Sequence, residues 1–173
     1  MKKVLFVILA LLSVTSCERD NCYSVFSRKY MVSFSCDANV SPYNLVNTPG
    51  QFISVRQNST DGKLHIVDSN GNKYDQELTD LQSRQFSMGL AGLIIGKPTF
   101  DNDNMSVWAY DLGCPECDSR NARLSFDAVG IATCSKCQGE WNLNSSGFPT
   151  KDSSRPLYRY PVMQNDGMIT VAN

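Results

Sequence analysis

The sequence has little histidine, no excess of either charge and no long apolar run. Its single histidine, His65, leaves too few imidazoles for a three-histidine zinc site or a histidine acid/base pair. Sixteen Lys and Arg residues stand against seventeen Asp and Glu residues, so we expect no broad basic surface and no nucleic-acid partner. Glycine-rich phosphate loops and G-x-S-x-G elbows are also missing, which weighs against an enzyme without excluding one.

The overall composition is that of an ordinary globular protein. The chain has 173 residues, of which 42% are hydrophobic and 19% are charged. This length and apolar content are sufficient for one domain with a buried core, and they exclude a disordered or collagen-like chain.

The amino-terminal end has the layout of an export signal. Lys2 and Lys3 precede the apolar run Val4–Leu12, whose nine residues are too few to span a bilayer as a helix. The next residues, S-V-T-S-C, end at Cys17 and resemble the lipobox of bacterial lipoproteins. An ordinary signal peptide with a coincidental cysteine is the alternative.

The lipobox resemblance implies a particular organisation of the chain. Residues 1–16 would be a cleaved signal peptide, and Cys17 would carry the lipid at the start of a tether over residues 17–21. The domain would then occupy residues 22–173, anchored through its lipid in the membrane of the bacterial cell envelope, at the outer membrane or on the periplasmic face.

Short strands and tight turns dominate the remaining sequence. Apolar and polar residues alternate over Tyr30–Ser35, and the runs Phe52–Val55 and Leu64–Val67 are rich in β-branched residues. Turn-forming pairs separate such runs: Pro49-Gly50, Asp61-Gly62, Asn70-Gly71 and Asp166-Gly167. The last pair predicts a hairpin between Leu157–Val162 and Met168–Val171. Only Asp75–Gln85 has a composition typical of a helix, so we predict an all-β fold.

Four of the seven cysteines form two C-x-x-C pairs. Cys114 and Cys117 belong to the sequence G-C-P-E-C, and Cys134 and Cys137 follow after sixteen intervening residues. Two residues between thiolates allow a tight loop to direct both sulfurs at one point, and a second loop completes four ligands. The spacing therefore predicts a tetrahedral metal site with loops at 113–118 and 133–139.

Other interpretations of these cysteines stay open at this point. Two disulfides are one alternative, because an exported protein meets an oxidising compartment. Thioredoxin-like redox chemistry is less favoured, since neither pair opens a helix after a strand. If a metal binds, four thiolates suit zinc, a rubredoxin-like single iron or a two-iron cluster, and the spacing does not separate these three.

The carboxy-terminal half resembles the Rieske domain family. Val107–Asp111 looks like the strand that enters the first cluster-binding loop of that family. The segment Cys134–Leu143, C-S-K-C-Q-G-E-W-N-L, is similar to the second loop, C-x-x-H-G-x-x-F-D-L, with one extra residue before the glycine. Arg155–Val162 and Asp166–Val171 look like the closing hairpin. The resemblance implies a β-sandwich with a small metal-binding tip formed by two loops.

The ligand histidines of the family are missing. Cys137 stands at the histidine position of the second loop, and Cys117 replaces the other histidine one residue further on. A Rieske centre with two histidine ligands is therefore excluded. His65 lies far upstream, and we expect it at a surface or half-buried strand position.

We predict one metal ion bound by four cysteines, with zinc preferred to iron. The predicted ligands are Cys114, Cys117, Cys134 and Cys137. The expected role is structural or interaction-based, with a protein partner at the metal-binding tip. The alternatives are an electron-transfer protein carrying a four-cysteine 2Fe-2S cluster or rubredoxin-like iron, and a metal-free domain with loop disulfides.

Two further predictions concern residues outside the four-cysteine motif. Cys22 and Cys36 flank a strand-like segment and form a possible disulfide, with free or buried thiols as the alternative. Trp141, directly after the second loop, is expected to pack in the core beneath it rather than to stack on a ligand.

Overall fold

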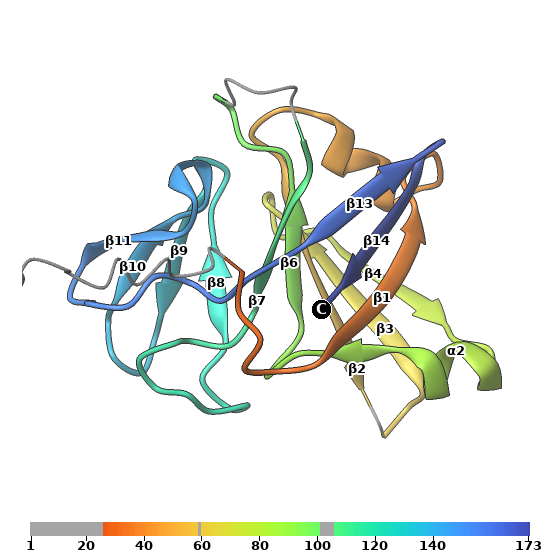
Figure 1. The fold of residues 1–173 in the computed structure, drawn as a ribbon, viewed down its shortest axis with the longest axis horizontal. Helices are drawn as coiled ribbons and strands as arrows, with labels where there is room; N and C mark the ends of the chain where they lie inside the picture. The colour runs from red at the N-terminus through yellow and green to blue at the C-terminus, as the bar shows by residue number, and fades with distance from the viewer. Residues whose placement is uncertain (1–25, 59, 101–105) are drawn as a thin grey trace, which may run out of the picture.

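The computed structural model describes residues 26–58, 60–100 and 106–173, and antiparallel strands form three sheets (Figure 1). The first sheet has the order β13 (Val162–Asn165), β14 (Met168–Ala172), β1 (Val32–Asp37), β5 (Ser87–Met88). The second has the order β12 (Arg159–Tyr160), β7 (Trp108–Asp111), β6 (Leu93–Gly96), β2 (Phe52–Asn58), β3 (Lys63–Asp68), β4 (Lys73–Glu77). The third has the order β11 (Phe148–Lys151), β10 (Glu140–Asn142), β9 (Ile131–Cys134), β8 (Leu124–Phe126).

Helical structure is a minor part of the described residues. It comprises the short helix α2 (Asp80–Gln85) and the 3-10 turns η1 (Tyr43–Asn47) and η2 (Leu143–Ser145). The predicted all-β fold class is therefore confirmed. None of the helices within these residues is long and apolar enough to cross a membrane.

Strands β2, β6 and β7 of the six-stranded sheet form the central layer of the molecule, because they are buried on both faces. In β2, Ile53 and Val55 face the first sheet, whereas Phe52 faces the third. In β6, Ile95 faces the first sheet and Ile94 faces the third. Side chains alternate across a strand, so two-sided packing requires an unbroken apolar run. This explains why the sequence shows apolar runs here in place of alternation.

Two hydrophobic cores result from this arrangement. The larger core lies between the first and second sheets and forms the sandwich around Phe34, Leu64 and Ile169. The second core lies between the central sheet and the third sheet and contains Trp141 and Tyr110. Figure 1 shows the third sheet at one end of the molecule, beside β6 and β7.

The carboxy-terminal hairpin is shorter than predicted. β13 pairs with β14 from Val162 opposite Val171 to Asn165 opposite Met168, around the predicted Asp166-Gly167 turn. Both turn residues have positive φ, 47° and 83°, as a two-residue hairpin turn requires. The prediction that 157–161 belongs to this hairpin is wrong, because β12 pairs with β7 in the central sheet.

The predicted helix over Asp75–Gln85 is also only half correct. Residues 73–77 form β4, which pairs with β3 at the edge of the central sheet. The helix begins after Thr79, whose hydroxyl accepts from the backbone N–H of Gln82 while the Gln82 side chain accepts from the backbone N–H of Thr79. This capping box fixes the start of α2, and composition alone did not locate it.

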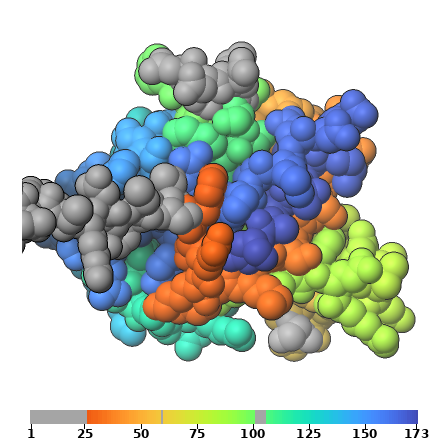
Figure 2. Space-filling model, viewed as in Figure 1, coloured from red at the N-terminus to blue at the C-terminus, as the bar shows by residue number. Residues whose placement is uncertain are grey.

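The first described residues lie against the carboxy-terminal strands. The backbone N–H of Ser27 donates to Arg159 O at 2.7 Å, and Asn173 Nδ2 donates to Tyr30 O at 2.8 Å. Figure 2 shows this segment, in orange, crossing the same face of the molecule as the carboxy-terminal strands in blue.

Candidate metal centre

The fold brings the two C-x-x-C pairs together beside the second core. The first loop leaves the central sheet at the end of β7, and the second loop begins at Cys134, the last residue of β9. All four cysteine sulfurs lie within 4.8 Å of one another, and they belong to Cys114, Cys117, Cys134 and Cys137. No other group of potential ligands of this kind occurs within the described residues.

Both loops have the same backbone design. The N–H of Asp118 donates to Cys114 O at 2.9 Å, and the N–H of Gln138 donates to Cys134 O at 2.9 Å. Asp118 and Gln138 each follow the second cysteine of a pair and have positive φ, 48° and 61°. The left-handed residue turns each loop so that both of its sulfurs face the same point.

The loops present one buried and one partly exposed sulfur each. Cys114 and Cys134 are fully buried, whereas Cys117 and Cys137 are half-buried. The closest sulfurs come from different loops: Cys114 Sγ lies 3.5 Å from Cys137 Sγ, and Cys117 Sγ lies 3.9 Å from Cys134 Sγ. A disulfide requires about 2.05 Å, so all four are free cysteines in this structure.

The sulfur spacing fits a tetrahedral ion. With metal–sulfur bonds of about 2.3 Å, the sulfurs of a tetrahedral site lie about 3.8 Å apart. The two shortest distances, 3.5 and 3.9 Å, lie on either side of this value. The four cysteines are therefore positioned to hold a metal ion.

The environment of the four thiols is uneven. Burial raises the pKa of Cys114 and of Cys117 above the ordinary thiol value. Burial acts in the same direction on Cys134, but backbone N–H groups of Cys137 and Lys136 outweigh it and lower the pKa. Loop N–H groups thus stabilise the Cys134 thiolate, the form that binds a metal.

Glu116 ties the first loop to the segment after β11. Its Oε1 accepts from the backbone N–H of Ser154 at 2.8 Å and of Arg155 at 3.0 Å. The hydroxyls of Ser153 and Ser154 donate to the same oxygen at 3.0 and 3.1 Å. These hydrogen bonds lower the pKa of Glu116, led by the one from the Ser154 N–H. The carboxylate is a positioning group between the two cysteines of the loop.

Asp118 ties the other side of the same loop to the first described residues and to the segment before β12. Its Oδ2 forms an ion pair with Lys29 Nζ, and its Oδ1 accepts from Tyr30 Oη at 2.6 Å and Tyr158 Oη at 3.0 Å. The Lys29 ammonium is the main cause that lowers the pKa of Asp118 to about 2. The loop is therefore held on both sides by charge-assisted hydrogen bonds.

Trp141 forms the wall behind the second loop. Its side chain is fully buried, and its Nε1 donates to Arg155 O at 2.8 Å. Gly139 lies directly against the ring, since a Cβ at that position would lie 2.7 Å from Trp141 Cη2. The prediction that Trp141 packs in the core is confirmed, and Gly139 is required by this close packing.

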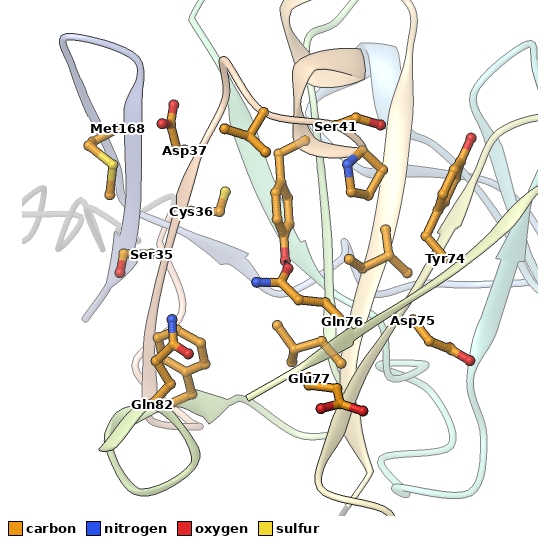
Figure 3. Close-up of a pocket in the computed structure, with 16 residues that line it drawn as sticks. Ser35, Cys36, Asp37, Ser41, Tyr74, Asp75, Gln76, Glu77, Gln82 and Met168 are labelled. Carbon is orange, nitrogen blue, oxygen red and sulfur yellow. Dashed lines mark hydrogen bonds between the residues drawn. The ribbon is translucent and has the colours of Figure 1, made fainter. Parts of the chain in front are cut away.

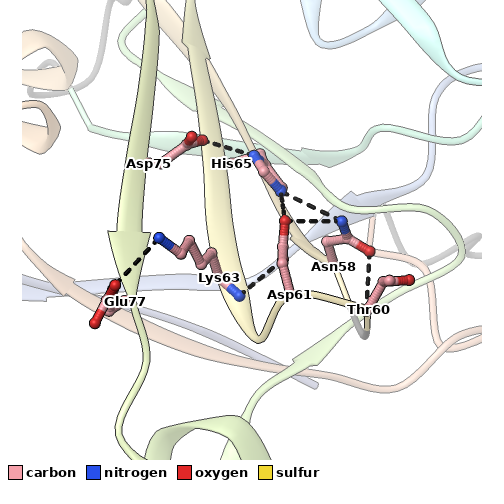
Figure 4. A network of polar contacts seen from close by, with 7 residues as sticks. All are labelled: Asn58, Thr60, Asp61, Lys63, His65, Asp75 and Glu77. Atoms are coloured by element: carbon pink, nitrogen blue, oxygen red, sulfur yellow. Dashed lines mark hydrogen bonds and ion pairs between the residues drawn. The ribbon is translucent and has the colours of Figure 1, made fainter.

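His65 belongs to a separate polar cluster on β3 (Figure 4). Its Nδ1 lies 2.6 Å from Asp75 Oδ1, and its Nε2 lies 2.9 Å from Asp61 Oδ2. Its side chain is 21% exposed, which confirms the predicted half-buried strand position. The imidazole is not among the residues grouped around the four sulfurs.

The cavity shown in Figure 3 is also separate from the cysteine loops. It has a volume of about 730 Å³ and lies between β1 and β4, with Tyr43 Oη donating to Gln76 Oε1 at 2.7 Å. Cys36 lies in its wall, and burial raises the pKa of this thiol to about 12. The thiol is therefore protonated and unreactive at neutral pH.

The remaining predicted cysteine sites lie outside the described residues. These are the lipidation site at Cys17 and the proposed disulfide partner Cys22. The pairing of Cys22 with Cys36 thus stays a prediction, as does the anchor.

Sequence reasoning found the four cysteines that cluster but missed the groups that hold their loops in place. Glu116 and Asp118 lie within or next to the first C-x-x-C pair, where an acidic residue gives no sign of its partners. Those partners are distant in sequence, up to 89 residues away. The one local signal in the sequence was Gly139, which lies two residues after Cys137 and two residues before Trp141.

Fold and site together define an all-β protein with a four-cysteine cluster suited to a metal ion. Comparison of this chain with models of protein families, with curated proteins and with solved structures finds no match. The resemblance to the Rieske family therefore stays a prediction.

Proposed function

We propose that this chain is a lipid-anchored protein of the bacterial cell envelope in which four cysteines bind one structural metal ion. The ion is zinc in preference to iron, and its role is to fix the two loops as a surface for a protein partner. The observation that carries the proposal is the convergence of four free sulfurs within 4.8 Å.

The spacing of the sulfurs favours one ion over a two-iron cluster. In a cluster, each pair of thiolates binds a different iron, so sulfurs on the two irons lie more than about 5 Å apart. Here every sulfur lies within 4.8 Å of every other. A single tetrahedral ion accounts for all of these distances at once.

The complete set of four protein ligands supports a structural role. Catalytic zinc sites keep an open position for water or substrate, whereas structural sites are closed. The buried sulfurs of Cys114 and Cys134 also belong to the second core, which is the smaller of the two cores. A bound ion would cross-link the two loops and compensate for the small size of this core.

The order of elements supports a Rieske-like arrangement. β7 leads into the first loop, β9 and β10 flank the second loop, and the chain then returns to the central sheet through β12. The lipid anchor rests on the sequence around Cys17 alone.

An electron-transfer protein with a single rubredoxin-like iron is the second candidate. Cys117 and Cys137 are half-buried, so two of the four sulfurs lie near the surface. This is the arrangement that an electron donor or acceptor docking at the loops would need.

One experiment separates the candidates. The full chain, purified in detergent without chelator or added metal, would be examined by elemental analysis and visible absorption. About one zinc per chain and no visible band would support the structural proposal. Visible bands with one iron would establish the second candidate instead, and two irons per chain would refute the single-ion geometry.

Matched variants test whether the four cysteines hold the ion. Cys134→Ser should abolish stoichiometric metal, because one of four ligands is lost. Cys36→Ser changes a buried cysteine outside the site and should retain the metal. Equal metal content in both variants would contradict the assignment of the site.

A further inference from the structure

Three arginine residues are among those that line one cleft of about 470 Å³. Arg56 comes from β2, and Arg120 and Arg123 come from the segment between the first cysteine loop and β8. Within the described parts of the chain, none of these three guanidinium groups has a hydrogen-bond, ion-pair or ring partner.

The fold requires these arginines to share the cleft. Arg56 lies on the face of β2 opposite Val55, which is the face turned away from the larger core. The segment 120–123 is held to the first loop, since the N–H of Cys114 donates to Ala122 O at 2.8 Å. The floor comes from residues 89–92, where a Cβ on Gly92 would lie 3.1 Å from Arg56 Cβ.

The cleft contains no carboxylate to neutralise these cations. Its lining has no Asp or Glu. The carboxylate beneath the floor is Asp111, which is fully buried. Its oxygens accept from the N–H groups of Leu90, Ala91 and Gly113 and from the hydroxyl of Tyr160. Asp111 is thus occupied inside the protein and does not pair with the arginines.

Arg120 and Arg123 are exposed and Arg56 is partly buried, so an anion from solution can reach all three residues. The three positive charges repel each other, although the chain as a whole has a net charge of -1. Guanidinium groups match the oxygens of phosphate in a two-pronged geometry. The volume of the cleft also lies within the range of small-molecule sites, about 300–1,000 Å³.

We infer that this cleft binds a phosphate group, either as free phosphate or as the phosphomonoester of a larger ligand such as a lipid headgroup. The proposal concerns a site distinct from the four cysteines and does not depend on which metal they bind. Arg120 and Arg123 supply charge from the loop side, and Arg56 supplies it from the central sheet.

Calorimetric titration of the full chain in detergent with inorganic phosphate tests the inference. We expect one-to-one binding with a dissociation constant of about 1 mM or tighter. Arg120→Gln and Arg56→Gln should each weaken binding by at least about tenfold, since each removes one charged contact. Arg28→Gln is the matched control, because Arg28 is exposed and does not line the cleft.

Two results would overturn the proposal. One is the absence of saturable binding up to about 10 mM phosphate. The other is binding that Arg56→Gln, Arg120→Gln and Arg28→Gln weaken to the same extent, which would indicate general charge attraction. Misfolding is excluded separately, since substitution of these unpaired side chains should leave the melting temperature and the metal content unchanged.

A second titration identifies the source of the phosphate group. Phosphatidic acid is added to the detergent micelles, with phosphatidylcholine at the same concentration as the control. A lipid headgroup as ligand predicts that phosphatidic acid competes with inorganic phosphate and that phosphatidylcholine does not. A soluble phosphate ligand predicts that neither lipid competes while binding of inorganic phosphate persists.

Discussion

Replacement of Gly139 by alanine should destabilise the second cysteine loop. An alanine Cβ would lie 2.7 Å from Cη2, 3.2 Å from Cζ3 and 3.3 Å from Cζ2 of Trp141. Carbon atoms prefer separations of about 3.5–4.0 Å, so the ring or the loop must move by about 1 Å. The ring is fully buried, and its Nε1 is held by Arg155 O at 2.8 Å. The loop is therefore the part that moves.

The expected magnitude follows from the cost of overpacking. An extra methyl group in a packed core costs about 1–3 kcal/mol in the free energy of unfolding. For a chain of this size, that corresponds to a fall of about 2–12 °C in the melting temperature. Metal affinity should also fall, because Gly139 O accepts from the backbone N–H of Cys134 at 3.0 Å.

Thermal unfolding by circular dichroism, combined with competitive metal titration, measures both effects. Ser135→Ala is the control, since it changes an exposed side chain of the same loop. Trp141→Phe in the Gly139→Ala background supplies a double-mutant cycle, in which the smaller ring should recover part of the loss. A melting temperature for Gly139→Ala within 1 °C of the wild type, with unchanged metal affinity, would refute this reasoning.

Three further predictions concern the metal, the first loop and pH. Removal of the ion with a chelator should increase hydrogen exchange in β8–β11 and leave β1–β3 protected. The reason is that the larger core contains none of the four clustered cysteines. Equal exchange in both regions would contradict two separable cores. Glu116→Ala should speed metal release by about 10–100-fold, as expected for a group that orients a ligand loop. The control is Glu140→Ala, because Glu140 forms one ion pair at 3.8 Å. Equal release rates for the two variants would contradict the role of Glu116. Burial raises the pKa of Asp111 above 3.8, so the folded state keeps its proton at pH values where the unfolded state has released it. Protonation of Asp111 therefore stabilises the folded state at low pH, and this stabilisation is lost as pH rises from about 3.8 through the folded-state pKa. Denaturant titrations should therefore show Asp111→Asn gaining stability relative to the wild type over that pH range, and a constant difference would contradict the raised pKa.

The sequence was sufficient to predict the cluster of four cysteines because their spacing is a local property. Each C-x-x-C pair places two sulfurs on one tight loop, whatever the rest of the fold. The meeting of the two loops was also predictable from sixteen intervening residues. The positions of Glu116 and Asp118 were not, since their partners come from segments that only the tertiary structure brings near.

The errors in the predicted elements have physical causes. Asp75 and Glu77 are typical helix-surface residues, yet they lie on an edge strand where charged side chains reach solvent. The chain leaves the central sheet after Tyr160 and enters the first sheet at Val162, so Pro161 marks a change of sheet. Tyr160 and Val162, on either side of Pro161, are both apolar, so the sequence gives no sign that the chain changes sheets here.

The two-sided burial of the central sheet has a consequence for solubility. Phe52, Ile94 and Tyr110 form an apolar face that the third sheet and the cysteine loops cover. Exposed apolar faces of this kind promote self-association. If the four cysteines hold a metal ion as proposed, a cell that supplied too little metal would hold a protein whose sandwich is intact but whose covered face is open to other chains. The cysteine loops would then also limit aggregation.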